Sequence, residues 1–133
     1  MSLAHLTLPT RDVEGTASFL EETLGYARLP VPGNSPIEAQ WLDIGRGQQL
    51  HVFHADGFEV SAFEGEFGRH IAVFQPLAHF DAVKARLTER GAEIFYAARP
   101  TPFERFFFRE PINGYVFEIV DAGSAPFAVH FDQ

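Results

Sequence analysis

The chain carries one pattern of residues twice, and this internal repeat limits its possible folds more than any other feature. The first copy spans residues 5–53 and the second spans residues 70–120. Each copy opens with a histidine in a short apolar run and ends with a second apolar run that also carries one polar side chain. These polar positions are separated by 51 − 5 = 46 residues in the first copy and by 118 − 70 = 48 in the second. They are occupied by His5, His51, His70 and Glu118. Because imidazole and carboxylate groups bind metals, the near-equal spacing predicts one composite metal site.

The size of the chain fits one compact domain built from two small modules. It has 133 residues, and its hydrophobic fraction of 46% allows apolar burial to offset the entropy lost on folding. We predict a single domain over 1–133, with one module at about 4–58, a second at about 68–122 and a tail at 123–133. The 15 Phe residues either fill the core or line an apolar pocket.

The composition excludes several classes of partner and ligand. A net charge of −8 repels nucleic-acid phosphates and leaves no basic patch for an anionic membrane. No apolar run approaches the roughly 20 residues that span a bilayer, and no charged-then-apolar leader opens the chain, so we expect a cytoplasmic protein. The chain has no Cys, so any metal must be held by nitrogen and oxygen atoms.

Local patterns predict a strand, a helix and further strands in each copy. Residues 10–12 offer helix-capping chemistry, and Gly25 ends the helix that follows. The first copy is expected to hold a strand at 4–9, a helix from Val13 to Leu24, a loop at 29–36, and strands at 37–44 and 48–54. The second is expected to hold a strand at 70–74, a helix from Pro76 to Gly91, and strands at 93–97, 104–109 and 115–120.

Strand parity predicts that the four polar residues share one face. Successive side chains of a strand point to opposite faces, and the neighbours of the four are almost all apolar, as suits a face covered by helices. Those apolar neighbours are Leu6, Leu50, Val52, Ile71, Phe117 and Ile119. The opposite, concave face would carry the polar four together with Thr7, Phe53, Ala72, Phe74 and Val116.

Three imidazoles and one carboxylate suit a divalent ion such as zinc, iron, nickel or manganese. A six-coordinate ion would keep two positions for water or substrate oxygens and would act as a Lewis acid. Each histidine alone also fits an ordinary histidine with a hydrogen-bond partner. An inward Glu118 is costly unless it is coordinated or paired, so its alternative is a salt bridge to an Arg. Arg99, Arg105 and Arg109 either clamp an anionic substrate or are solvated and ion-paired.

Four segments resemble the vicinal oxygen chelate superfamily of glyoxalases, fosfomycin- and bleomycin-resistance proteins and extradiol dioxygenases. They read AHLTLPTRDV at 4–13, FLEETLGY at 19–26, GRHIAV at 68–73 and FREPINGYVFEIV at 108–120. The resemblance implies an α+β fold of two βαβββ modules that form an open, curved mixed sheet, a glyoxalase-like barrel, with helices on the convex face. It places metal ligands on the first and last strands of each module, at the four polar positions, and implies a homodimer.

The resemblance also guides the prediction of function. Lactoylglutathione lyases usually carry a carboxylate where this chain has His51, which leaves Glu118 as the one ligand able to act as a carboxylate base. We predict a metal-dependent lyase, isomerase or dioxygenase that chelates a small oxygenated substrate through two oxygens and stabilises an oxyanion or enediolate. Glu118 would be catalytic as well as a ligand. Substrate contacts are predicted at Thr7, Phe53, Phe74 and Arg109, with Phe106 or Phe108 as further candidates for an apolar wall.

Two other functions stay open at this point. The first is a non-catalytic protein that binds an antibiotic-type small molecule, as bleomycin-resistance relatives do, although that role does not need three imidazoles. The second is a structural zinc site, which is the weaker alternative because such sites are closed tetrahedra and often contain Cys.

Overall fold

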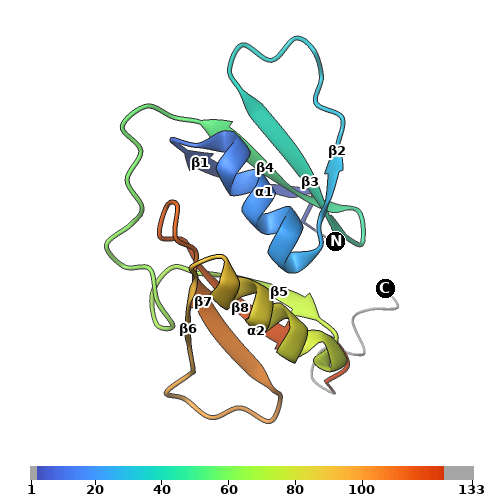
Figure 1. Cartoon of the computed structure of the whole chain (residues 1–133), viewed down its shortest axis with the longest axis vertical. Helices are drawn as coiled ribbons and strands as arrows, with labels where there is room; N and C mark the ends of the chain where they lie inside the picture. Colours follow the sequence, from blue (N-terminus) through green and yellow to red (C-terminus); the bar gives the residue numbers. More distant parts are fainter. Residues whose placement is uncertain (1–2, 125–133) are drawn as a thin grey trace. The chain divides into compact units, whose positions relative to one another are not determined.

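The computed structural model describes residues 3–124, which form two compact units, residues 3–59 and 60–124 (Figure 1). We call them the N-terminal unit and the C-terminal unit. Most of the tail predicted at 123–133 lies outside the described residues. Over residues 3–124 none of the helices has the length and apolar character needed to cross a membrane.

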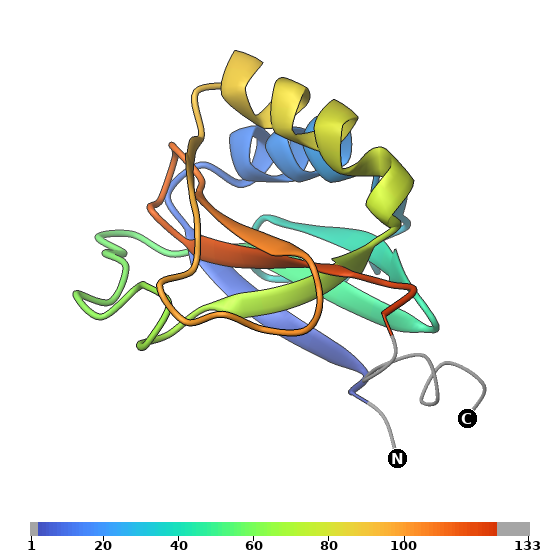
Figure 2. The same cartoon turned by 90° about the horizontal axis from the view of Figure 1, so that it is seen from below.

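The N-terminal unit is a four-stranded mixed sheet with one helix. Its elements are β1 (His5–Thr10), α1 (Val13–Leu24), β2 (Ala27–Leu29), β3 (Ala39–Gly45) and β4 (Gln48–His54). The strands are ordered β1-β4-β3-β2, with β1 parallel to β4 and the other pairs antiparallel. Helix α1 packs on β3 and β4, so its apolar residues cover one face of this sheet (Figure 2).

The C-terminal unit repeats this topology. Its elements are β5 (Ile71–Gln75), the short 3-10 helix η1 (Leu77–His79), α2 (Phe80–Glu89), β6 (Glu93–Phe95), β7 (Arg105–Arg109) and β8 (Val116–Asp121). The order β5-β8-β7-β6, with β5 parallel to β8, is the same as in the first unit. The predicted α+β fold of two βαβββ modules is therefore confirmed, with the described strands forming two sheets of four.

The first helix begins and ends where the sequence predicted, because both ends carry specific capping residues. The Asp12 side chain accepts a hydrogen bond of 2.9 Å from the backbone N–H of Gly15, which satisfies one of the free donors of the first turn. At the other end Gly25 adopts a left-handed backbone with φ 79° and donates its N–H to Glu21. In the second helix, Phe80, Val83 and Leu87 are buried as predicted.

One strand was missed by the sequence analysis. Residues Ala27–Leu29 form β2 and pair with Trp41–Asp43 of β3. A run of three residues with an arginine at its centre shows no clear alternation, so periodicity cannot separate it from the loop that follows. The Arg28 side chain at the centre of β2 donates two hydrogen bonds of 2.8 Å to the carboxylate of Glu14 in α1.

The strand register places equivalent residues beside the predicted ligands in both units. His51 of β4 pairs with Thr7 on one side and with Trp41 on the other. Glu118 of β8 pairs in the same way with Ala72 and Phe107. The repeat seen in the sequence is thus a repeat of register. In each unit one predicted ligand lies on the second strand of the sheet order, with a small residue beside it on the first strand and an aromatic residue beside it on the third.

Candidate metal centre

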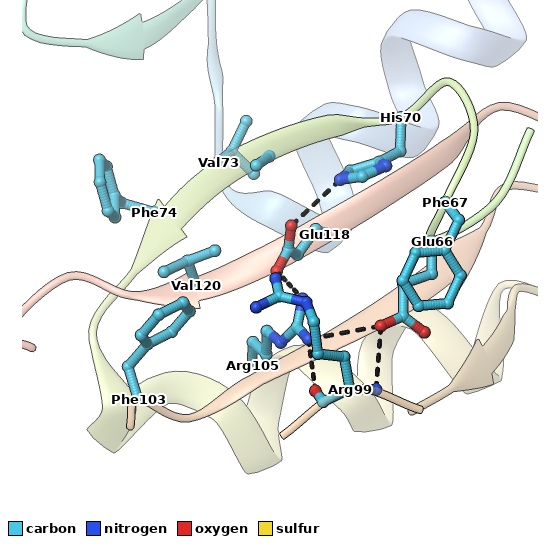
Figure 3. Close-up of a pocket in the computed structure, with 11 residues that line it drawn as sticks. Glu66, Phe67, His70, Val73, Phe74, Arg99, Phe103, Arg105, Glu118 and Val120 are labelled. Carbon is cyan, nitrogen blue, oxygen red and sulfur yellow. Dashed lines mark hydrogen bonds and ion pairs between the residues drawn. The ribbon is translucent and has the colours of Figure 1, made fainter. Parts of the chain in front are cut away.

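The C-terminal unit brings His70 and Glu118 into direct contact. His70 lies immediately before β5, and Glu118 lies in the middle of β8, the strand that pairs with β5. His70 Nε2 is 3.2 Å from Glu118 Oε1 (Figure 3). Both side chains are largely removed from water, with 22% of His70 and 9% of Glu118 exposed. The 48 residues that separate them in the sequence are bridged by the parallel strand pair.

A backbone carbonyl fixes which nitrogen of His70 carries a proton. His70 Nδ1 lies 3.0 Å from the carbonyl oxygen of Gly65, which can only accept a hydrogen bond, so Nδ1 is the N–H donor. In the neutral ring Nε2 then keeps a lone pair, and it faces Glu118 Oε1, which is also an acceptor. Two acceptors in contact require a cation between them, either a proton or a metal ion. Neighbouring ligands of one ion lie about 3 Å apart at metal–ligand distances near 2.1 Å, so this pair fits a metal.

The loop that carries Gly65 is tightly closed. The backbone N–H of Arg69 donates to Phe63 at 2.9 Å, and the N–H of Gly65 donates to Arg69 at 3.2 Å. A Cβ atom added at Gly68 would overlap the carbonyl oxygen of Phe63. This close approach of backbone to backbone sets the direction of the Gly65 carbonyl and therefore the orientation of the His70 ring.

The salt bridge considered as the alternative role of Glu118 is present. Arg105, at the start of β7, donates from Nη1 to Glu118 Oε2 at 2.9 Å. This ion pair is enough to accommodate a buried carboxylate, so burial of Glu118 alone no longer requires a metal. What still fits a metal is the other oxygen, Oε1, and its contact with His70 Nε2.

The N-terminal unit arranges His5 and His51 differently. The two rings are stacked with their centroids 4.0 Å apart and an interplanar angle of 12°, and Trp41 stacks on the opposite face of His51 at 4.1 Å and 1°. Nitrogen lone pairs lie in the ring plane, so the lone pairs of stacked rings run side by side and do not converge. This pair needs a ring rotation before both nitrogens can bind the same ion.

His51 is further restrained by Gln49. Its Nε2 lies 2.7 Å from Gln49 Oε1, two residues earlier in β4, so this nitrogen is the donor and Nδ1 is the one left with a lone pair. Burial lowers the pKa of His51, and the charge of a protonated His5 lowers it further. Both effects favour the neutral imidazole, which is the form that a metal ligand needs.

Each unit by itself brings together two of the four predicted ligands. Within either unit, over the residues that the structure describes, a third His, Asp or Glu does not join the pair in a metal-binding group. The fit to a metal is therefore good for the His70–Glu118 pair and incomplete for the His5–His51 pair. The four-residue ligand set stays a prediction.

A cavity of 220 Å³ opens beside the His70–Glu118 pair. Its polar end is formed by His70, Glu118 and Arg105, with Glu66 and Arg99 beside them (Figure 3). The remaining lining residues are apolar and are Phe67, Ala72, Val73, Phe74, Phe103 and Val120. A small, mostly apolar cavity with a few polar groups gathered at one end is the usual form of a small-molecule site.

The predicted substrate contacts lie in different places. Phe74 lines the cavity and is 43% exposed. Thr7 is exposed on β1 beside His51, and the ring of Phe53 meets His51 edge-on with centroids 6.3 Å apart. Arg109 donates to the backbone oxygens of Gly114 and Glu64, at 3.2 and 3.4 Å, and is not a lining residue. These roles therefore stay predictions.

Phe106 and Phe108 do not form the apolar wall considered above. Both are fully buried in the core, where Phe106 packs edge-on against Phe80 and Phe108 stacks on Phe117. The residue between them, Phe107, is the one that lies in register with Glu118, and its ring meets His70 edge-on at 5.3 Å. The run 106–108 is apolar throughout, so the sequence contains no alternation that would assign its two faces.

Sequence reasoning singled out neither Glu66 nor Phe67 and Phe103, and it left Arg105 with several roles. Glu66 and Phe67 lie in the connector just before His70, Phe103 lies between β6 and β7, and Arg105 is the first residue of β7. One signal was available for Arg105. It has the same strand parity as Phe107, so a register between β7 and β8 would have placed it on the face of Glu118.

A family model supports the assignment suggested by these features. The model of the Glyoxalase/Bleomycin resistance protein/Dioxygenase superfamily matches residues 2–119. The chain belongs to this superfamily. No curated protein sequence gives a significant match.

Solved structures with the same fold come from several members of the superfamily. The fosfomycin resistance protein FosX from Listeria monocytogenes has a TM-score of 0.73 and 16% identity, covering 98% of this chain and 97% of that one. FosX from Mesorhizobium loti has a TM-score of 0.70 and 21% identity, covering 97% of each chain. The oxidase ChaP-H2 has a TM-score of 0.69 and 22% identity, covering 91% and 93%. At these identities the likeness establishes the fold alone.

Proposed function

We propose that this member of the superfamily is a divalent-metal-dependent enzyme that acts on a small oxygenated substrate. The observation that carries the proposal is the contact between His70 Nε2 and Glu118 Oε1 at the polar end of the cavity. A FosX from Listeria monocytogenes has been solved with Mn(II) and a dihydroxypropylphosphonic acid, which supports divalent metal use within this fold. His5 and His51 are proposed as the remaining ligands, on the basis of their matching positions in the repeat.

The metal is proposed to be zinc, iron, nickel or manganese, since nitrogen and oxygen ligands suit all four. When bound, it would supply Lewis acidity toward two adjacent oxygens of the substrate. The chain's own residues would do the rest. The Gly65 carbonyl would hold His70 in its ligating tautomer, and Glu118, once it loosens from the metal, would take or return a proton. Phe67, Phe74 and Phe103 would keep water away from the apolar part of the substrate.

Metal binding is the first test of this proposal. Protein stripped with a chelator should bind Mn(II) in calorimetric titrations, and Glu118→Gln should weaken binding by more than about 100-fold, since outer-shell changes alone cost 10- to 100-fold. The control is Asp121→Asn, which removes the same charge from the same strand, where the Asp121 carboxylate accepts a hydrogen bond from the N–H of Gly123. Wild-type protein that takes up no divalent metal would contradict the proposal.

Chelation of the substrate is the second test. Catechol, with two adjacent oxygens, should bind the Mn(II)-loaded protein, while phenol should bind at least tenfold more weakly. The broadening of each probe's proton signals by Mn(II) measures binding to the loaded protein, and calorimetric titration measures binding to the metal-free protein. If the protein is a metal-dependent enzyme of this kind, catechol binding should be lost when the metal is removed.

The cavity also supports a second candidate, a non-catalytic small-molecule binding protein. Its walls contain three phenylalanines, of which Phe67 is 77% and Phe74 is 43% exposed, and exposed aromatic rings are typical of surfaces that capture ligands. This function predicts that catechol and phenol bind equally well, with or without metal. The same titrations therefore separate the two functions.

A further inference from the structure

Arg105 connects the predicted ligand Glu118 to a part of the molecule that lies outside the metal centre. Its side chain is only 6% exposed, and its guanidinium makes contacts at both of its terminal nitrogens. Nη1 donates to Glu118 Oε2 at 2.9 Å. Nη2 donates to the backbone oxygen of Arg99 at 2.7 Å and lies 3.4 Å from Glu66 Oε2. The guanidinium also lies over the ring of Phe107, 5.6 Å from its centroid.

Glu66 fixes the far end of this arrangement. Its carboxylate accepts hydrogen bonds from the backbone N–H groups of Ala98 and Arg99, at 2.8 and 3.2 Å, and only 11% of its side chain is exposed. The dashed contacts in Figure 3 run without a break from His70 through Glu118 and Arg105 to Glu66. The guanidinium is therefore held by an anchored carboxylate and a backbone carbonyl, and it is not a freely moving cation.

This restraint decides which oxygen of Glu118 is available. A carboxylate can bind an ion through one oxygen or through both. Here Oε2 is occupied by Arg105, and only Oε1 faces His70. We propose that Arg105 is a positioning residue that restricts Glu118 to one ligating oxygen and thereby sets the coordination number of the bound metal. The inference rests on the proposed metal-dependent function.

A purely structural ion pair would behave differently. Breaking it would lower the stability of the C-terminal unit because it leaves a buried charge unpaired, but it would not change how a metal is coordinated. The positioning role depends on the planar fork of the guanidinium, which holds Glu118 with one nitrogen and the Arg99 carbonyl with the other. A lysine keeps the charge and cannot make both contacts, so Arg105→Lys separates geometry from charge.

The experiment compares Mn(II) affinity and the visible spectrum of the Co(II)-substituted protein. Arg105→Lys should weaken Mn(II) binding about tenfold or more, the cost typical of a lost outer-shell partner. It should also change the intensity of the Co(II) absorption bands, which follows the coordination number. The matched control is Arg28→Lys, which loses an equivalent fork to Glu14 in the N-terminal unit and should keep both the wild-type affinity and the wild-type spectrum.

The outcomes are distinguishable. If wild-type protein binds metal and Arg105→Lys matches it in affinity and spectrum, the positioning role is wrong and the proposed function stands. If wild-type protein binds no metal, both are overturned. Should Arg105→Lys fail to fold, as judged by circular dichroism, Glu66→Gln removes the outer anchor and leaves the Glu118 contact in place. It should weaken Mn(II) binding two- to threefold with a change in the Co(II) spectrum, and an unchanged spectrum would count against the inference.

Discussion

The N-terminal unit presents its predicted ligands face to face, whereas the C-terminal unit presents the edge of an imidazole to a carboxylate. Both units use the same strands and the same register, with an aromatic residue beside the ligand on the third strand. In the first unit that aromatic residue, Trp41, stacks on His51. In the second, Phe107 lies under His70 edge-on and leaves its nitrogen directed at Glu118. Equal spacing in a repeat therefore predicts equal position, and the neighbouring side chains decide whether a ligand is ready to bind.

The largest expected effect concerns the two aromatic residues themselves. Phe107 is fully buried and stacks on Phe95, so Phe107→Ala should lower the free energy of unfolding by about 3–5 kcal/mol. Trp41 is only partly buried, and Trp41→Ala should cost clearly less. Urea unfolding of the two variants measures the difference. Equal losses would mean that the aromatic position supports both units in the same way.

The next effect concerns metal affinity. His70 is already oriented by Gly65, while His51 must rotate relative to the stacked His5 ring before the two can bind one ion. His70→Ala should therefore reduce Mn(II) affinity at least tenfold more than His51→Ala does, in calorimetric titrations of chelator-treated protein. If His51→Ala has the larger effect, the claim that the C-terminal unit holds the better-oriented ligand is wrong. Trp41→Phe, which keeps an aromatic ring beside His51 and removes no proposed ligand, serves as the control for altered packing.

The smallest effect concerns one hydrogen-bonded carboxylate in each unit, Glu14 in the N-terminal unit and Glu66 in the C-terminal unit. The pKa of Glu66 is lowered chiefly by the hydrogen bond from the backbone N–H of Ala98. The pKa of Glu14 is lowered chiefly by its hydrogen bond with Arg28. A carboxylate with a lowered folded-state pKa stabilises the protein above its unfolded pKa, and this contribution is lost as the pH falls through the folded value. Both units should therefore lose stability below about pH 4.5, the ordinary carboxyl value.

Salt should separate these two carboxylates. The Glu14–Arg28 pair is solvent-exposed, so 0.5 M NaCl should screen it and move the pKa of Glu14 toward its ordinary value. Glu66 is held mainly by neutral backbone donors, and its pKa should move less. Carbon-detected NMR titrations at low and high salt would measure both. A larger salt response for Glu66 would show that charge, and not the backbone, holds it.

The features that sequence predicted well are those encoded by neighbouring residues. Helix α1 was predicted to its end residues because Asp12 and Gly25 cap it locally. The βαβββ topology followed from the repeat and from the family resemblance. By contrast, β2 is too short to show a period, and the face of Phe106 and Phe108 could not be assigned within an apolar run.

The surroundings of the predicted ligands were harder to predict for a different reason. Arg105 lies 13 residues from Glu118 and 39 from Glu66, and only the strand register brings the three together. Parity alone could place Glu118 on the inner face, but it could not choose between Arg99, Arg105 and Arg109 as its partner. The stacking of His5 on His51 likewise depends on side-chain rotation, which no spacing in the sequence encodes.

The crowded backbone at Gly68 has a consequence for how mutations in this protein should be read. Gly68 has no functional group, yet any larger residue there would push against Phe63 and reopen the loop that aims the Gly65 carbonyl. A saturation screen scored by ligand capture should rank this position beside the histidines. Substitutions at Gly68 would fail because the backbone of Phe63 leaves no room for a side chain there. A survey that looks only for reactive side chains would overlook this position.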